Sequence, residues 1–198
     1  VDEVADQAIG MMIACNRGFL KVDRDLKTPL EPWDCRAVEP VKRLAGATLG
    51  IVGLGRIGQA TAQRAKAMRM RIIAHDPYLR PGTEKVFGVE MVTLPELLAT
   101  SDVVSLHTPL TKKTERLINA ETLAQMKPDA ILVNTSRGAV VDTAALSMAL
   151  RTGKIGAAGI DVLPTEPPSQ DEPLVQLWRE AEKANFNLIL TPHTAFYS

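Results

Sequence analysis

The sequence is poor in aromatic residues and has no excess of either charge. Only 4% of its 198 residues are Phe, Trp or Tyr, and its formal net charge at pH 7 is zero. Few aromatics argue against base-stacking platforms, and balanced charge argues against a broad basic face for nucleic acid or anionic lipid. We therefore expect no direct nucleic-acid partner and no membrane partner.

Long apolar runs and cysteine pairs are also scarce. No apolar run approaches the roughly 20 residues that a membrane-spanning helix needs. The start, Val1-Asp2-Glu3, is acidic where a signal peptide is basic. Cys15 and Cys35 form neither a disulfide framework nor a metal-ligand spacing. We expect a cytoplasmic protein with two free thiols and no metal site.

The stretch 49–76 contains, in order, the parts of a dinucleotide-binding unit. An apolar run at 49–52 is typical of a buried strand, and the next six residues, Gly53-Leu54-Gly55-Arg56-Ile57-Gly58, form a G-x-G-x-x-G turn. Helix-forming residues occupy 59–70, and a second apolar run leads to Asp76. A glycine turn alone is weak evidence, because it can simply join a strand to a helix. The complete order predicts a dinucleotide site.

Each residue type in this unit has a separate physical task. Gly53 permits the tight turn, Gly55 lets a diphosphate approach the backbone, and Gly58 lets the helix pack closely on the strand. The N–H groups and the dipole at the helix start attract phosphates. Asp76 suits ribose hydroxyls and repels a 2′-phosphate, which predicts NAD rather than NADP. Arg80 lies close enough in the sequence to leave that preference open.

Beyond this unit, apolar runs alternate with helical patterns. Such alternation is typical of an α/β fold with a Rossmann-type, doubly wound parallel sheet, here of about seven strands, with helices on both faces. We expect strands near 49–52, 72–74, 89–92, 102–106, 130–133, 156–160 and 188–190. We expect helices near 3–19, 59–70, 94–99, 119–126, 142–152 and 174–184. Residues 21–47 contain three prolines and are expected to be irregular, with Trp33 plugging the core beneath them.

Distinctive polar residues follow several of the expected strands. Ligands of a parallel sheet bind outside the carboxyl ends of its strands, so residues that end strands meet at one edge. The residues that this rule selects are Gly53 to Gly58, Asp76, His107 to Pro109, Asn134 to Gly138, Asp161 and His193.

Three charged or titratable residues near this edge suit hydride transfer to a ketone. That reaction needs a proton donor, a positive charge for the substrate carboxylate and a group that orients the donor. His193 suits the donor because histidine titrates near neutral pH, and Arg137 offers a planar fork for a carboxylate. Glu166 suits the orienting group. Each also has a plainer reading, as a loop histidine, a surface arginine or a solvated glutamate.

Six motifs carry a family resemblance. They are Val4-Ala5-Asp6, the glycine unit at 49–58, Leu106-His107-Thr108-Pro109-Leu110, Leu132-Val133-Asn134-Thr135-Ser136-Arg137-Gly138, Gly159-Ile160-Asp161-Val162 and Thr191-Pro192-His193. In this order, the motifs resemble those of the NAD-binding domain of the NAD-dependent D-2-hydroxyacid dehydrogenases. The resemblance covers nearly the whole chain. The ending at 191–198 and Asp76-Pro77-Tyr78 are most similar to the C-terminal-binding-protein branch, which includes transcriptional corepressors as well as enzymes.

The resemblance implies roles for individual residues. Arg137, Glu166 and His193 match the catalytic triad of the family. For NAD, it implies that Arg56 and Ile57 meet the diphosphate, Asp76 the adenosine ribose, and Asp161 the nicotinamide amide. It further implies that the cofactor is lined by Thr108, Pro109, Thr114, Thr135 and Ser136.

The resemblance also implies a domain organisation and a reaction. We interpret 1–20 as a linking and dimer helix and 48–193 as the Rossmann core, and we expect the family's substrate domain to lie outside this sequence. The implied activity is NAD-dependent reduction of small 2-keto acids to D-2-hydroxy acids by a homodimer, with the isolated chain binding NAD but nearly inactive. The alternative is an NAD-sensing, corepressor-like module that dimerises with its cofactor, because helix 3–19 is more apolar than one sheet face requires.

Overall fold

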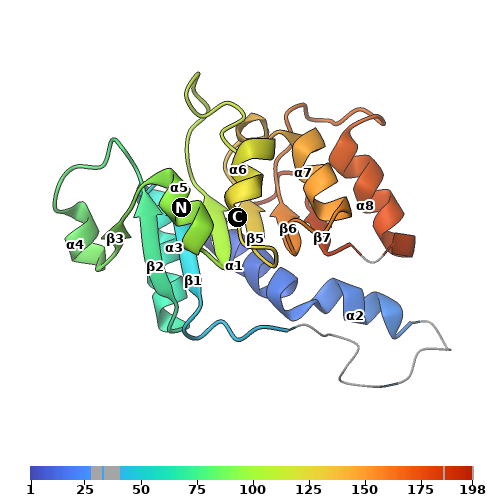
Figure 1. Cartoon of the computed structure of the whole chain (residues 1–198), viewed down its shortest axis with the longest axis horizontal. Coiled ribbons are helices and arrows are strands. Elements are labelled where there is room, and N and C mark those ends of the chain that lie inside the picture. Colours follow the sequence, from blue (N-terminus) through green and yellow to red (C-terminus); the bar gives the residue numbers. More distant parts are fainter. Residues whose placement is uncertain (28–32, 34–40, 185, 198) are drawn as a thin grey trace.

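Seven parallel strands form the sheet on which the chain is built (Figure 1). In this computed structural model the described residues are 1–27, 33, 41–184 and 186–197. The strands are β1 (Thr48–Val52), β2 (Arg71–His75), β3 (Glu90–Met91), β4 (Val103–Leu106), β5 (Ile131–Asn134), β6 (Ala157–Ile160) and β7 (Leu188–Leu190). Their order in the sheet is β3-β2-β1-β4-β5-β6-β7. The strands β2 and β3 are therefore added on one side of β1, and β4 to β7 are added on the other side. The predicted fold class and strands are confirmed.

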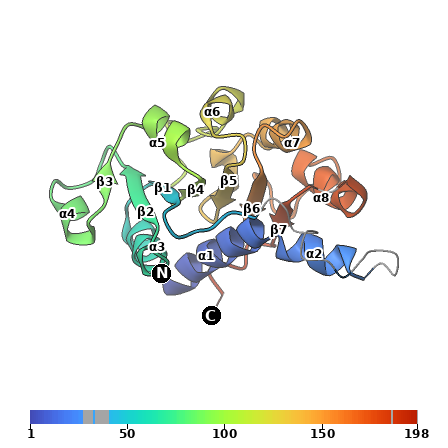
Figure 2. The same ribbon diagram turned by 60° about the horizontal axis from the view of Figure 1, so that its bottom comes forward.

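Helices cover both faces of the sheet, as Figure 2 shows. α1 and α3 lie on one face, and α5 to α8 lie on the other. The helices are α1 (Asp2–Arg17), α2 (Phe19–Asp25), α3 (Arg56–Ala67), α4 (Thr83–Phe87), α5 (Leu94–Thr100), α6 (Ala120–Gln125), α7 (Thr143–Arg151) and α8 (Pro173–Ala184), with a 3₁₀ turn η2 (Gly138–Val140). The predicted helices are all present, and those capped by Asn119 and Asp142 begin where the sequence places them.

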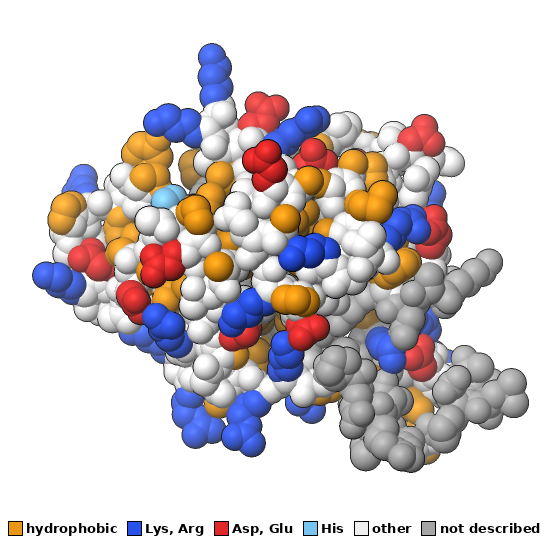
Figure 3. Space-filling model, viewed as in Figure 1, with side chains coloured by type: hydrophobic (Ala, Val, Ile, Leu, Met, Phe, Trp, Pro, Cys, Tyr) orange, Lys and Arg blue, Asp and Glu red, His pale blue; other side chains and the backbone are white. Residues whose placement is uncertain are grey.

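The outer surface mixes charges of both signs with apolar side chains. On the face shown in Figure 3, acidic and basic groups are interspersed. The surface also carries several ion pairs, among them Arg71 with Glu90 at 2.6 Å and Arg151 with Glu180 at 2.7 Å. Among the described residues, no helix is both long enough and apolar enough to cross a membrane.

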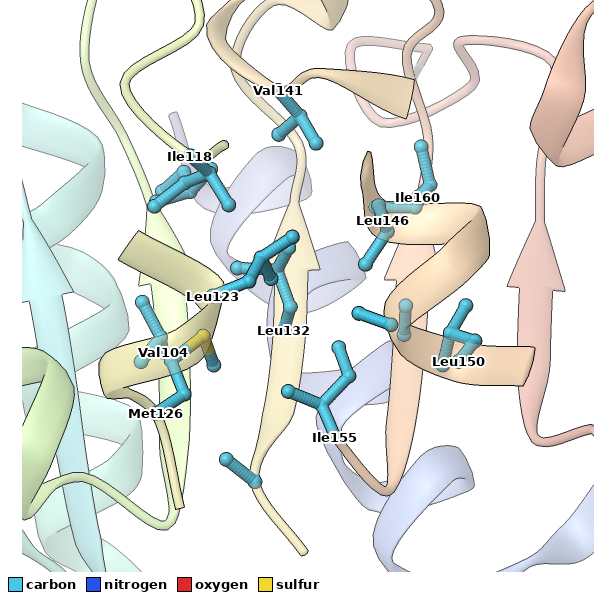
Figure 4. Close-up of a cluster of buried hydrophobic side chains, with 14 of the residues drawn as sticks. Val104, Ile118, Leu123, Met126, Leu132, Val141, Leu146, Leu150, Ile155 and Ile160 are labelled. Atoms are coloured by element: carbon cyan, nitrogen blue, oxygen red, sulfur yellow. The ribbon is translucent and has the colours of Figure 1, made fainter. Parts of the chain in front are cut away.

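One half of the core lies between the sheet and helices α5 to α8. Figure 4 shows Leu123 of α6 packed over Leu132 of β5, and Leu146 of α7 beside Ile160 of β6. These four side chains are at most 2% exposed. Burying a leucine contributes roughly 1.5–3 kcal/mol relative to leaving it in water. This packing fixes the strands whose carboxyl ends carry the candidate site.

The other half of the core lies under α1. A Cβ on Gly159 of β6 would lie 2.8 Å from the Cβ of Met11, so the small residue allows α1 to approach the sheet closely. Cys15 is 3% exposed, and burial raises the pKa of its thiol to about 12, which keeps the thiol protonated at neutral pH. The buried residues of α1 are Ala5, Ala8, Met11, Met12 and Cys15.

The region after α1 departs from the sequence predictions. Residues 21–25 were expected to be irregular, but they continue the helix α2, which starts directly after the left-handed Gly18. Trp33 was expected to plug the core, but its side chain is 90% exposed. The prolines on which the irregular segment was predicted lie outside the described residues. The helical spacing of Phe19, Leu20 and Val22 indicates this helix, but the prediction gave more weight to the prolines that follow.

Candidate functional site

The glycine turn leaves room for a ligand at one point only. Gly53 has a φ of +92°, and a Cβ there would lie 2.8 Å from the carbonyl oxygen of His107. A Cβ on Gly58 would lie 2.2 Å from the carbonyl oxygen of Gly53, so only glycine lets α3 start so close to the turn. A Cβ on Gly55, in contrast, would meet no atom within 4 Å. The backbone at Gly55 therefore faces open space, where the sequence predicts a diphosphate.

Asp76 joins the end of β2 to the glycine turn. Its Oδ2 accepts the N–H of Leu54 at 2.9 Å, and its Oδ1 accepts the N–H of Tyr78 at 2.9 Å. A carboxylate offers about four acceptor positions, so two bonds leave capacity for ribose hydroxyls. The structure therefore places Asp76 against the turn as predicted, while its contact with a ribose stays a prediction.

Two adjoining cavities lie at the carboxyl edge of the sheet. The first, of about 660 Å³, lies between the glycine turn, the end of β2 and the loop after β4, and is called the glycine-turn cavity below. The second, of about 240 Å³, lies beside His193 and is called the histidine cavity. His107, Thr108 and Pro109 line both cavities, so one extended molecule can reach from the first into the second.

The predicted cofactor residues divide between these cavities. Those in the glycine-turn cavity are Gly53, Gly55, Asp76 and Thr114. Those in the histidine cavity are Ile57, Thr135, Ser136, Arg137 and His193. Three predicted residues line neither: Arg56 is exposed at the start of α3, Gly58 is buried inside the turn, and Asp161 is buried behind the histidine cavity.

The mouth of the glycine-turn cavity contains a contact that the sequence did not reveal. Lys113 Nζ donates to the hydroxyl of Tyr78 at 3.1 Å and lies 5.6 Å from the centroid of its ring. Both residues line the cavity. Thr114 fixes the lysine arm, because its Oγ1 donates to the carbonyl of Pro109 at 2.7 Å and accepts the N–H of Thr111 at 2.8 Å. The contact joins segments 35 residues apart, beyond any short-range sequence signal.

His193 and Glu166 form a hydrogen-bonded pair. Glu166 Oε2 lies 2.6 Å from His193 Nδ1, while Glu166 Oε1 accepts the N–H of Leu163 at 2.9 Å. The ring of Phe196 meets the imidazole edge-on, with centroids 5.3 Å apart. Because Nδ1 is engaged by the carboxylate, Nε2 is the nitrogen left for a substrate. The structure thus brings together two residues that lie 27 positions apart.

Asp161 organises the turn that carries His193. Its Oδ2 accepts the N–H of Ala195 and its Oδ1 the N–H of Thr194, both at 3.0 Å. Oδ1 also accepts the hydroxyl of Thr191, and the carbonyl of Asp161 accepts the N–H of His193 at 2.8 Å. His193 has a φ of +53°, an uncommon value for a residue with a side chain, which these bonds help to hold. Asp161 therefore acts on the site through the loop, and its predicted bond to a nicotinamide amide stays a prediction.

Arg137 is held by Asn134, a residue that carried no separate prediction. Asn134 is fully buried at the end of β5, and its Oδ1 accepts both the N–H of Ser136 at 3.0 Å and its hydroxyl at 2.8 Å. Asn134 Nδ2 donates to the carbonyl of Arg137 at 3.0 Å. The Arg137 guanidinium is exposed, and its Nη1 donates to the carbonyl of Ser136 at 2.6 Å. An Asn directly after a strand, followed by Ser-Arg-Gly, was the signal for this side-chain-to-backbone latch.

Three buried polar atoms at the cavities have no partner within the described part of the chain. They are His107 Nδ1, Thr108 Oγ1 and Thr135 Oγ1. Buried polar atoms are normally hydrogen-bonded, so unpartnered ones beside a cavity indicate a ligand. Together with the open space at Gly55 and the carboxylate of Asp76, they fit a molecule with phosphates, ribose hydroxyls and a polar ring substituent. NAD has this composition.

The remaining titratable residues give no sign of a metal. His75 is the last residue of β2, and its Nδ1 lies 3.1 Å from the carbonyl oxygen of Val92. Across the described ranges, no group of three or more His, Cys, Asp or Glu side chains could hold a metal ion.

Comparisons with known proteins find similarity along nearly the whole chain. Residues 9–195 match the family model described as "D-isomer specific 2-hydroxyacid dehydrogenase, NAD binding domain". The chain is 45% identical to a glyoxylate reductase of Korarchaeum cryptofilum, over 98% of the chain and 56% of that protein. It is 42% identical to a hydroxypyruvate reductase of Thermotoga maritima, over 96% of the chain and 58% of that protein. The chain therefore spans a little over half the length of these two relatives.

A solved structure shows the same arrangement of the backbone. The crystal structure of D-lactate dehydrogenase from Aquifex aeolicus, complexed with NAD and lactic acid, superposes with a TM-score of 0.86 at 34% identity. The match covers 99% of this chain and 60% of that one.

Proposed function

Because this chain belongs to the D-isomer specific 2-hydroxyacid dehydrogenase family, as its NAD binding domain, we propose that its carboxyl edge binds NAD and reduces 2-keto acids to D-2-hydroxy acids. The glycine-turn cavity takes the adenosine, with Asp76 at the ribose. The diphosphate lies against the N–H groups at the start of α3, beside Gly55 and Arg56. The nicotinamide enters the histidine cavity, lined by Ile57, Thr135 and Ser136.

The chemistry rests on the pair formed by His193 and Glu166. Bound NADH supplies a hydride to the carbonyl carbon of the substrate. His193, protonated on both nitrogens, gives its Nε2 proton to the carbonyl oxygen and becomes neutral. Glu166 holds the Nδ1–H throughout, so the ring keeps its orientation and its positive form is stabilised before the transfer. In the oxidation direction, His193 takes the same proton back.

Arg137 supplies the charge that the substrate carboxylate requires. Arg137 lines the histidine cavity with His193, and its backbone carbonyl is held by Asn134. A planar fork can hold a carboxylate by two bonds and so orient the neighbouring carbonyl toward His193. The observation that carries the proposal is the 2.6 Å contact between Glu166 and His193 beside the same cavity as Arg137.

The substrates proposed are small 2-keto acids such as glyoxylate and hydroxypyruvate, after the names of the two relatives. A panel of 2-keto acids with NADH and NADPH, assayed on the full-length protein, tests the reaction and the cofactor preference. We expect NADH to be preferred and His193→Ala to lower turnover by orders of magnitude while NADH still binds. Unchanged turnover in His193→Ala would remove the histidine from its role.

A homodimer is proposed for the same protein. Phe19 and Leu20 of α2 are 55% and 53% exposed, and Trp33 is 90% exposed, which leaves large apolar side chains for a second copy to cover. Light scattering with and without NADH tests this assembly. Assignment to the C-terminal-binding-protein branch stays a prediction from two short motifs, and the NAD-sensing corepressor role stays a prediction from the apolar helix at 3–19. The relatives named above are reductases and a dehydrogenase. A cytosolic location likewise stays an expectation.

A further inference from the structure

His107 lies where the two cavities join. It follows the last residue of β4, and its backbone N–H donates to the carbonyl of Val52 in β1 at 2.8 Å. His107 lines both the glycine-turn cavity and the histidine cavity. A dinucleotide that occupies both cavities must therefore pass this residue.

The two ring nitrogens of His107 have different surroundings. Nε2 lies 2.9 Å from the hydroxyl of Ser105, a residue only 2% exposed on the same side of the strand. Nδ1 is buried and has no partner within the described residues. Leaving a buried ring nitrogen unpaired is unfavourable, so a site that retains one is built for a partner that comes from outside the chain.

Two neighbouring hydroxyl oxygens are also buried without a hydrogen-bond partner in the described chain. They are Thr108 Oγ1 and Thr135 Oγ1, and both residues line the histidine cavity with His107. His75, which lines the glycine-turn cavity, differs because its Nδ1 already meets the carbonyl of Val92 at 3.1 Å. A buried Nδ1 without a partner thus distinguishes His107 from His75, and His75 provides an internal reference.

The imidazole of His107 is neutral. Burial lowers its pKa from 6.5 to about 4. A neutral ring has one N–H donor and one acceptor nitrogen. If Ser105 donates its O–H to Nε2, the proton of the ring is on Nδ1 and can be offered to a ligand. Phosphate oxygens accept hydrogen bonds but cannot donate them, so this tautomer matches the middle of a dinucleotide.

We propose that His107 is a cofactor-positioning residue that donates its Nδ1–H to an oxygen of the diphosphate or of the adjoining ribose of NAD. This inference rests on the proposed function, since it needs NAD in both cavities. The hydrogen bond ties the middle of the cofactor to the end of β4. It thereby sets how far the nicotinamide reaches toward His193.

A ligand series and a pair of variants test the proposal by calorimetry. Ser105→Ala/His107→Phe removes the ring nitrogens together with the hydroxyl that they satisfy, and Ser105→Ala alone is the matched control. Relative to that control, we expect the double variant to bind NADH about 5- to 10-fold more weakly, the loss of one hydrogen bond. Adenosine, which carries no phosphate and occupies only the part of the glycine-turn cavity beside Asp76, should bind both variants equally. ADP against ADP-ribose then distinguishes the diphosphate from the ribose as the acceptor.

Nitrogen NMR on the unaltered chain provides a readout that does not depend on a variant folding. With ¹⁵N-labelled histidine, the three imidazoles can be followed together. We expect NAD to shift Nδ1 of His107, with the proton on Nδ1, while Nδ1 of His75 changes little. An unchanged His107 Nδ1 in the NAD-saturated chain, the opposite tautomer, or equal weakening of adenosine binding overturns the inference. Absence of NAD binding to the unaltered chain would instead overturn the proposed function.

Discussion

Replacing Glu166 by Gln tests whether this residue orients the imidazole of His193. The amide keeps the shape of the side chain, and its oxygen can still accept the N–H of Leu163, now 2.9 Å from Oε1. Its NH₂ group then replaces the carboxylate oxygen that lies 2.6 Å from His193 Nδ1. An N–H facing an N–H disfavours the protonated imidazole, which is the form that donates the proton.

The magnitude follows from the exposure of the pair. A hydrogen bond to a charged group contributes roughly 1.5–3 kcal/mol. The two side chains are 35% and 34% exposed, so solvent screening places the loss at the lower end. About 1.5 kcal/mol corresponds to a roughly 10-fold lower kcat.

The assay is NADH oxidation with glyoxylate by the full-length protein, with NADH affinity measured separately. We expect kcat to fall roughly 10-fold and NADH affinity to stay unchanged. Glu121→Gln, an exposed carboxylate on α6, is the control and should match the unaltered protein. Equal kcat in Glu166→Gln and the control would remove Glu166 from its orienting role.

Three further predictions follow from the same geometry. Gly58→Ala should lower the free energy of unfolding by roughly 1–3 kcal/mol, because its Cβ would lie 2.2 Å from the carbonyl oxygen of Gly53. Gly55→Ala should melt like the unaltered chain, because its Cβ meets no atom within 4 Å, but the methyl group should weaken NADH binding. Thermal melting and calorimetry on both variants check this pair. The pKa of His107 is about 4 in the folded chain, against 6.5 when the ring is exposed in the unfolded chain. The free energy of unfolding should therefore be highest above pH 6.5 and fall by about 3 kcal/mol as the pH drops to 4. Denaturant titrations of the unaltered chain and of His107→Gln should differ in that acid slope. Tyr78→Phe keeps the ring but removes the 3.1 Å hydrogen bond with Lys113, which is worth about 0.5–1 kcal/mol. Stopped-flow fluorescence should therefore show NADH dissociating a few-fold faster. An unchanged dissociation rate contradicts a role of this hydrogen bond in retaining NADH.

Periodicity and strand-end position predicted most of the fold and much of the site. Alternating strands and helices dictated a parallel sheet, and the rule that ligands bind at carboxyl edges selected Asp76, Arg137 and His193 before any contact was known. The pairing of Glu166 with His193 was also predicted, from the chemistry that a proton donor needs. Here the local pattern and the tertiary arrangement agree.

Other features depend on contacts that a local pattern does not contain. Tyr78 and Lys113 meet only because the loops after β2 and β4 converge on one cavity. Trp33 was assigned to the core on hydrophobicity alone, yet its side chain is 90% exposed. The helix α2 was missed because the prolines that follow it in the sequence outweighed its own apolar spacing. Asn134 could have been found, since an Asn after a buried strand commonly bonds the backbone ahead of it.

The most direct test is calorimetric titration of the chain with NADH, alongside Asp76→Ala. We expect saturable binding at one site per chain, and a clear loss of affinity in the variant, whose side chain no longer meets the ribose or holds the N–H of Leu54. A chain that releases no heat with NADH, or an Asp76→Ala variant that binds as tightly as the unaltered chain, would contradict it.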